Sequence, residues 1–441
     1  METQVESGMP VVGRRAAFAR RDFRRYYIGY ATSLFGSAMA GTAATFAFLG
    51  TGRGAGDLGL VMAMGIVPIL LCLPVAGVIA DRLGCRRVLL FADGLRCANR
   101  AAFAATLLAV HRPPVWVFMV FAVLQGAGEG IFFPAYSALI PRLVDRDILT
   151  PANALLGIAR SATTVLGPTL SGILIAAFGS ALVLGVDSAS FAVCFVALFG
   201  IPISAPAASA IPGKFLNQLR EGWSVFAAHP WLWMQTLQFA LFNFMVWAPF
   251  LVIGPTLSDQ HYGGARAWGI AMGSEGLGAI LGGSLLLRGR RREPRSPLVV
   301  AIIFTAAYAL APGAFALRLP LPAIAVLMAL CGAGTAISGA LYSSVEQRVL
   351  PADALARVSS YNYLGAFAIG PLGLAIAGPV GAAIGYTTLL GFGATYQIIS
   401  TLLLLAVPAG RHVPAADSVS GTSTSSASSS ESESRQPTTA Q

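Results

Sequence analysis

Charged side chains inside long apolar segments are the residues of this sequence best placed to do chemistry. Glu129, Arg160, Asp187 and Glu275 each lie in a run of apolar and small residues. A charge at the centre of a membrane span costs roughly 3 kcal/mol or more unless it is paired or faces water, so each residue is a candidate for function. A carboxylate in such a place can take up and release a proton, and a neighbouring arginine changes how readily it does so.

Glu129 and Arg160 form the best candidate pair. Counted along their helices, both lie roughly 10–16 Å from the same ends of neighbouring segments, within reach of a side-chain contact. One hypothesis makes Glu129 a proton carrier that Arg160 adjusts and for which a cationic or amphipathic substrate competes. The alternative is a permanent structural ion pair between packed helices, and the spacing leaves both open.

Three other acids carry the same two interpretations. Glu275 lies in MGSEGLGAILGG, where the glycines indicate either a cavity wall or a close helix crossing. Asp187 lies in a segment expected to support the outside of a helix bundle. Asp93 stands three residues before Arg96, a spacing that lets the two side chains pair on one helix face, so we expect a structural role there.

Uncharged polar and aromatic residues predict further parts of a substrate cavity. The candidates are Gln125, Asn243, Trp247, Tyr361 and Asn362. Aromatic side chains suit an apolar, drug-like molecule, although a phenylalanine-rich membrane helix is often packed or lipid-facing instead.

The elements that must position these residues are membrane-spanning helices. The chain has 441 residues, of which 56% are hydrophobic and 11% charged, and its 49 glycines and 26 prolines suit packed membrane helices better than soluble ones. A window of about 19 residues identifies twelve spans. They cover roughly residues 26–49, 58–80, 88–110, 115–139, 152–177, 180–201, 231–255, 266–287, 298–317, 321–343, 356–379 and 385–408.

Two related halves of six spans are expected. NALLGIARSATTVLGPTLSG in the fifth span and YNYLGAFAIGPLGLAIAG in the eleventh share a Gly-Pro pair, which begins at Gly167 and at Gly370. Such repeats surround a cavity near the middle of the membrane in transporters that open alternately to each side. We therefore predict an all-α membrane protein with six-helix bundles over residues 26–201 and 231–409.

Charge and composition predict the remaining segments. About 22 lysines and arginines fall on one side of the spans and about four on the other, which predicts that both termini are cytoplasmic. Residues 1–25 are then a basic cytoplasmic segment without a cleavable signal, 202–230 a linker with an amphipathic surface helix, and 410–441 a disordered serine-rich tail. The four outer cations are Arg53, Arg112, Arg266 and Arg318.

The segment GVIADRLGCRRVLL, between the second and third spans, carries the most specific motif. It resembles the signature loop between helices two and three of the major facilitator superfamily, at the matching position. Finer matches, ADGLR, FFPAYSALIP, VDSASFAV and REGW, resemble the drug/proton antiporter branch that includes macrolide and enterobactin exporters. The resemblance covers roughly residues 20–408. Its signature residues are Gly77, Asp81, Arg82, Gly84, Arg86 and Arg87.

The resemblance implies two pseudo-symmetric bundles of six helices and secondary active transport by alternating access. We expect the signature loop to hold the cytoplasmic ends of the halves together in one state. Asp81 would face the positive end of helix eleven, and the arginines would reach acids such as Asp145 and Asp147. Glycines allow a close helix contact at Gly77 and a tight turn at Gly84.

The helix-five motif of the antiporter branch is retained, but two other features depart from that branch. Many members carry an acid in the first span and an arginine in the fourth that are associated with proton coupling, and here Ser37 and Ala122 stand in those places. The loop GGSLLLRGRRREPRSP of the second half has no aspartate, so we expect one strong latch rather than two. The retained motif residues are Gly167, Pro168 and Gly172, with Ser171 replacing one glycine.

We therefore expect an exporter of a small amphipathic molecule, such as a drug-like compound, a siderophore or a secondary metabolite. Protons are the candidate coupling ion. The alternatives are an uncoupled or nutrient-importing facilitator and a transporter-like membrane sensor that moves nothing. We expect a multi-pass monomer in the cell membrane, in contact with lipid.

Other classes of function fit the sequence poorly. The net charge of +10 comes without a nucleic-acid recognition motif, and no GxxxxGK[ST] sequence indicates an ATP-driven pump. The five cysteines form no CxxC pair, and the four histidines lie at or beyond the ends of the spans. We therefore expect no metal, no cofactor and no enzymatic activity.

Overall fold

The computed structural model of the chain describes residues 17–145, 148–201, 223, 226–227, 229–288, 296–350, 365 and 368–408. Within these ranges the regular secondary structure is helical. Helices are expected because a span in lipid must satisfy every backbone N–H and C=O group within itself. Ten of the helical segments are long and apolar enough to cross a membrane.

The first half contains one helix for each of the six predicted spans. Its third helix carries several charges, which is why hydropathy alone does not select it although it has 25 residues. The helices are α2 (Arg21–Leu49), α3 (Ala55–Leu83), α4 (Cys85–Ala109), α5 (Val115–Leu143), α6 (Leu149–Phe178) and α7 (Ser180–Phe199).

The second half repeats this pattern with interruptions. A π-helical turn, Asn243–Trp247 (η2), divides its first span, and a 3-10 turn, Ala306–Ala309 (η4), divides its third. The predicted eleventh span is described as a helix from Gly370 onward. The α-helices are α9 (Pro230–Phe242), α10 (Ala248–His261), α11 (Ala265–Arg288), α12 (Pro297–Thr305), α13 (Leu310–Ala316), α14 (Leu321–Val349), α16 (Gly370–Ile384) and α17 (Tyr386–Ala406).

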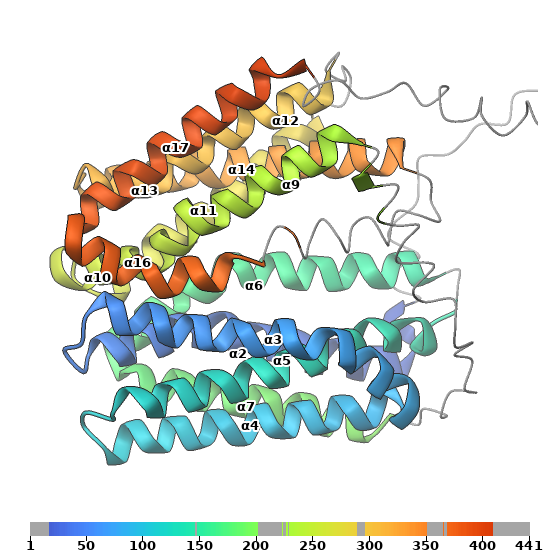
Figure 1. Cartoon of the computed structure of the whole chain (residues 1–441). Helices are drawn as coiled ribbons and strands as arrows, with labels where there is room; N and C mark the ends of the chain where they lie inside the picture. Colours follow the sequence, from blue (N-terminus) through green and yellow to red (C-terminus); the bar gives the residue numbers. More distant parts are fainter. Residues whose placement is uncertain are drawn as a thin grey trace, which may run out of the picture.

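Figure 1 shows these helices as two bundles, α2 to α7 in one and α9 to α17 in the other. The ribbons of the bundles converge at one end and diverge toward the end where the chain enters α2 and leaves α17. All-helical bundles in two halves confirm the predicted fold class.

Small residues bring the two halves into backbone contact at the converging end. The first crossing joins α3 to α16, where a Cβ on Gly378 would collide with the backbone of Ala55 and Gly56. The second joins α6 to α11, where Gly269 lies against the carbonyl oxygen of Pro168 and the backbone of Gly172. Both crossings depend on the missing side chain, which lets helix backbones come close.

The helix-five motif therefore serves two interfaces. Gly167 packs on Ala38 of α2, within the first half, whereas Pro168 and Gly172 meet α11 of the second half. Ser171, which replaces a glycine, donates a hydrogen bond of 2.8 Å to the carbonyl of Met39. The motif thus fastens α6 to its own bundle and places it against the other one.

The turn of the signature loop is as expected at Gly84, which joins α3 to α4 with a φ of 87°, a value that glycine adopts readily. The acidic partner expected for Arg86 belongs to the closed state of the loop, and Arg86 has other partners in this conformation. Its guanidinium donates to the carbonyls of Leu198 and Phe199 at the end of α7, where a helix C-terminus attracts positive charge. Asp145 instead forms an ion pair with Arg20.

Several predictions fall on positions outside the described residues and side chains. These include Gly77, Asp81 and Arg82 of the signature loop, Asp147, most of the 202–230 linker, and Tyr361 and Asn362. The 410–441 tail and the greater part of residues 1–25 also lie outside them.

A glycine packed in the α3–α16 crossing and an unpacked glycine on α11 should respond in opposite ways to substitution by alanine, as measured by the stability of the protein. Gly378→Ala should destabilise the protein by about 1–3 kcal/mol, because the new methyl group forces two backbones apart. Gly283→Ala, on α11 where nothing lies within 4 Å of the added Cβ, should stabilise it by roughly 0.5–1 kcal/mol through helix propensity. Thermal unfolding of the purified protein in detergent measures both. Equal melting temperatures for the two variants would contradict the backbone contact.

Candidate functional site

Two buried ion pairs lie in the interior of the first bundle. Asp93 and Arg96 pair on α4, which confirms the contact expected from their spacing. Asp187 of α7 pairs with Arg100 of α4, with 2.9 Å between Arg100 Nε and Asp187 Oδ2. Both aspartates are fully buried, so each carboxylate depends on its arginine for neutralisation.

Arg96 is held by aromatic rings as well as by Asp93. Its guanidinium carbon lies 4.0 Å from the ring centre of Phe132 and 4.4 Å from that of Phe191. A cation between two ring faces is stabilised by both rings, so Asp93 and two aromatic rings together hold the Arg96 guanidinium in place. The arrangement has the character of a structural support between α4, α5 and α7.

A chain of amide hydrogen bonds leads from α4 to Glu129. Asn99 donates 3.0 Å to the carbonyl of Phe121 and contacts Gln125 Oε1 at 3.5 Å. Gln125 Nε2 then donates 2.9 Å to Glu129 Oε1. Gln125 and Glu129 lie one helical turn apart on α5, so the amide fixes one carboxylate oxygen and leaves the other available.

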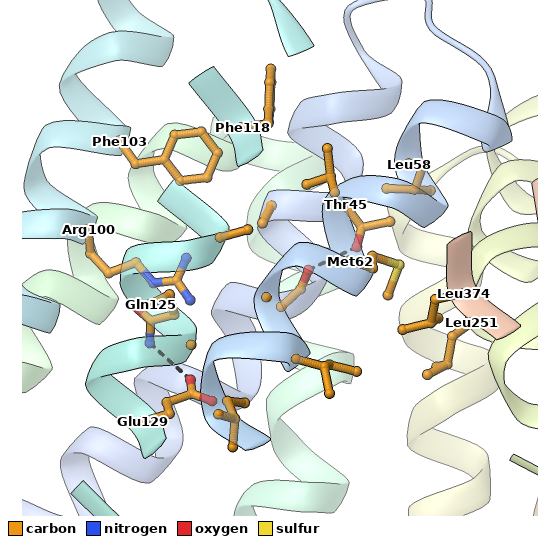
Figure 2. Close-up of a pocket in the computed structure, with 18 residues that line it drawn as sticks. Thr45, Leu58, Met62, Arg100, Phe103, Phe118, Gln125, Glu129, Leu251 and Leu374 are labelled. Atoms are coloured by element: carbon orange, nitrogen blue, oxygen red, sulfur yellow. Dashed lines mark hydrogen bonds between the residues drawn. The ribbon is translucent and has the colours of Figure 1, made fainter. Parts of the chain in front are cut away.

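Glu129 and Gln125 line a cavity of about 250 Å³, which Figure 2 shows in close-up. Helices α2, α3, α4 and α5 form most of its wall, and Leu251 of α10 and Leu374 of α16 reach it from the second half. Arg100 also lines it, so the Asp187–Arg100 pair borders the same space. The apolar part of the wall includes Leu58, Met62, Phe103 and Phe118.

The cavity has the chemistry of a site for an amphipathic molecule. Its wall is almost entirely apolar, and the charged and amide groups converge on one side of it, as Figure 2 shows. Pockets of this kind bury the body of a small molecule and orient it with a few polar contacts. Because both halves line it, a movement between the halves changes its shape.

The structure does not join Glu129 to Arg160, so the predicted pair is wrong in this conformation. Arg160 Nη2 donates 3.2 Å to the hydroxyl of Tyr30 on α2, whereas Glu129 accepts from Gln125. Tyr30 in turn stacks on Tyr136 of α5, with ring centres 4.1 Å apart. Aromatic side chains thus stand where we expected a direct ion pair.

Ser37 and Ala122, which depart from the antiporter pattern, each lie near a charged side chain of another helix. Ser37 Oγ contacts Asp187 Oδ1 at 3.4 Å, and Ala122 lines the same cavity as Arg100. An acid of α7 therefore lies beside Ser37, and an arginine of α4 lines the cavity together with Ala122. Sequence position alone could not reveal these neighbours.

The candidates of the second half lie apart from this cavity. Glu275 lies partly buried on α11, near Tyr308 and Cys331. Asn243 and Trp247 occupy the two ends of the π-helical turn, where Asn243 donates 2.9 Å to the carbonyl of Phe239. π-Helical turns within longer helices are often found at functional sites.

Sequence reasoning missed the role of Arg100 and the two leucines from the second half. The spacing argument that pairs Asp93 with Arg96 gives no partner for Arg100, because its partner Asp187 lies on another helix. Leu251 and Leu374 carry no signal that separates them from other apolar residues. Only the rotation of each helix about its axis brings them to the cavity.

Comparison with known proteins identifies the family. A model of the Major Facilitator Superfamily matches residues 26–374. The chain belongs to this superfamily. The match includes the signature loop and extends from the first bundle to the start of α16 in the second.

Among curated members of the superfamily, three exporters are similar to the chain. Macrolide efflux protein A of Streptococcus pyogenes is 25% identical over 64% of this chain and 70% of its own length. The multidrug efflux pump Tap of Mycolicibacterium fortuitum is 28% identical over 80% of this chain and 86% of its own. The enterobactin exporter EntS of Escherichia coli is 28% identical over 77% of this chain and 80% of its own.

Solved superfamily structures agree on the fold. A bacterial homologue of the human lysosomal transporter Spinster, in an inward-facing and occupied conformation, superposes with a TM-score of 0.66. It covers 89% of this chain and 98% of its own, at 15% sequence identity. The arrangement of the helices is therefore the superfamily fold.

The Asp187–Arg100 pair predicts a strong dependence of stability on both partners. Asp187→Asn should lower the free energy of unfolding by about 3–5 kcal/mol, because it leaves Arg100 buried and unpaired. The double variant Asp187→Leu with Arg100→Met should recover most of this loss, since it removes both charges. Thermal unfolding of the native protein and of these two purified variants tests this. A double variant less stable than Asp187→Asn would contradict the proposed energetics.

Proposed function

We propose that the chain exports a small amphipathic molecule across the cell membrane by alternating access. The observation that carries this proposal is the cavity whose wall is mostly apolar, whose polar groups converge on one side, and to which both halves contribute. The similarity to macrolide, multidrug and enterobactin exporters supports outward transport of such molecules. Drug-like compounds, siderophores and secondary metabolites are the substrate classes.

The proposal includes an orientation. With both termini in the cytoplasm, as the distribution of arginines predicts, the converging end of Figure 1 faces outward. The conformation is then open toward the cytoplasm, with the α3–α16 and α6–α11 crossings closing the outer side. A substrate would enter the space between the halves from inside the cell or from the inner leaflet.

Transport would follow from movement of the two bundles, residues 26–201 and 231–409, as units. In the outward-open state the glycine crossings separate and the cytoplasmic ends come together. The signature loop then acts as the latch, with Asp81 against the positive end of helix eleven. Because Arg86 caps α7 in the present conformation, it stabilises the first bundle while the latch is open.

Protons are the proposed coupling ion, with Glu129 as the carrier. Its carboxylate lines the cavity and has one oxygen held by Gln125. Protonation of Glu129 and binding of a substrate there would exclude each other if both require the free carboxylate oxygen. Arg100, held by Asp187, keeps a positive charge at the same wall.

Uptake into inside-out vesicles tests the proposal. A panel of fluorescent amphiphiles, cationic, neutral and anionic, would be offered with and without an imposed proton gradient. We expect gradient-driven accumulation of at least one compound, and its reduction to the level without a gradient in Glu129→Gln. Asp57→Asn, an exposed acid at the start of α3, should behave like the native chain.

The outcomes separate the alternatives. Accumulation that ignores the gradient and persists in Glu129→Gln would mean uncoupled transport. Movement only toward the cytoplasmic side would mean an importer. No movement of any compound by a correctly folded chain would contradict transport and favour a membrane sensor.

A further inference from the structure

Arg160 is an arginine within a span of the first bundle that does not line the cavity. It lies on α6, eleven residues after Leu149 and thus about 16 Å from the start of the helix, well inside the span. Its side chain is exposed. An arginine at this depth is costly unless it is paired or reaches water, so an exposed one has a role to explain.

Helix α6 borders the second bundle, as Figure 1 shows, and packs against α11 through Pro168 and Gly172. Gly157, one turn before Arg160, has nothing within 4 Å of the position of a Cβ. Asn153 and Thr164, on the same face, are exposed as well. Arg160 therefore lies on an exposed polar face of α6, beside a glycine that no other described residue packs against.

Arg160 differs from the other arginines inside the first bundle in the charge of its partner. Arg96 and Arg100 each pair with a buried aspartate. Among the residues that the structure describes, the side chain of Arg160 has one hydrogen-bond partner, the neutral hydroxyl of Tyr30. A guanidinium offers five N–H donors, so most of its donors and its full charge remain for another group.

Tyr30 gives this guanidinium a fixed position. Its ring is 3% exposed and stacks on Tyr26, Phe132 and Tyr136, with centroid distances of 6.1, 6.4 and 4.1 Å. The hydroxyl that accepts from Arg160 is therefore carried by a ring that packing holds in place. A guanidinium oriented in advance binds a planar oxyanion with less loss of side-chain freedom.

We infer that Arg160, oriented by Tyr30, is an anion-binding residue that receives a carboxylate or comparable oxyanion of the transported molecule. The paired geometry of guanidinium and carboxylate gives two parallel hydrogen bonds and a preference that neutral analogues cannot match. The substrate class is then an amphipathic organic acid, or a zwitterion with an acidic group. This inference rests on the proposed export function for the origin of its ligand.

Binding of two matched probes to the purified full chain tests this directly. Dansylglycine carries a carboxylate, and dansylglycinamide is its neutral counterpart. In nanodiscs of phosphatidylcholine, which exclude anionic lipid as the occupant of Arg160, the native chain should bind the carboxylate more tightly. Arg160→Gln should weaken carboxylate binding by at least about tenfold and leave amide binding within about twofold.

Two further variants distinguish anion binding from a structural role. Arg160→Lys should keep a reduced preference for the carboxylate, because it retains the charge but not the planar fork. Tyr30→Phe should weaken binding of the carboxylate probe alone, by a few-fold. Arg112→Gln, a cation in the exposed α4–α5 connection, is the matched control and should change neither affinity.

The inference is overturned if the native chain binds the carboxylate no better than the amide. It is also overturned if Arg160→Gln weakens the binding of both probes equally. The same holds if this variant abolishes the uptake of both probes while the ratio of their affinities stays unchanged. Transport of the amide or of a cationic amphiphile in vesicles would in those cases leave the export function standing. Failure of all transport, with the carboxylate preference intact, would instead remove the export function and leave an anion-binding membrane protein.

Discussion

A charge within a membrane span must be neutralised or hydrated, and this requirement organises the first bundle. Asp93 and Asp187 are fully buried, and each has an arginine of α4 as its partner. The Asp187–Arg100 pair joins α4 to α7, and Arg96 joins α4 to α5 through the ring of Phe132, so the charged groups hold these helices together. The polar side of the cavity is then an extension of the same network, through Arg100, Gln125 and Glu129. The polar groups of the cavity and the ion pairs that hold the helices together are therefore neighbours.

The two halves share a fold but differ in the side chains that they contribute. In the described part of the second half, Glu275 is the charged residue that lies well away from the helix ends, and no arginine pairs with it. That half contributes leucines to the cavity and small residues to the crossings. Contacts made by leucines and small residues can shift without breaking an ion pair, whereas the charged network ties the helices of the first half together. The asymmetry lets the halves move relative to one another at little electrostatic cost.

Local features of this fold were predictable from the sequence, and features that depend on helix rotation were not. Most of the described spans follow from hydropathy, the turn at Gly84 from its type, and the Asp93–Arg96 pair from a spacing of three residues. The depth of Glu129 and Arg160 was also readable, because each residue of a helix adds a fixed rise. Their partners were not, since depth says nothing of the direction in which a side chain points about the helix axis. The Asp187–Arg100 pair, formed across two helices, was missed for this reason.

The π-helical turn Asn243–Trp247 makes the first span of the second half two helices in series. A π turn interrupts the regular ladder of hydrogen bonds, so the helix is more compliant there than elsewhere. The segment beyond it, α10, carries Leu251 to the cavity. Bending at this single turn can therefore shift one wall of the cavity while the rest of the bundle stays in place. The shape of the cavity and the rotation of the bundle are then two separate degrees of freedom. The cavity can adapt to molecules of different size while the bundles rotate in the same way.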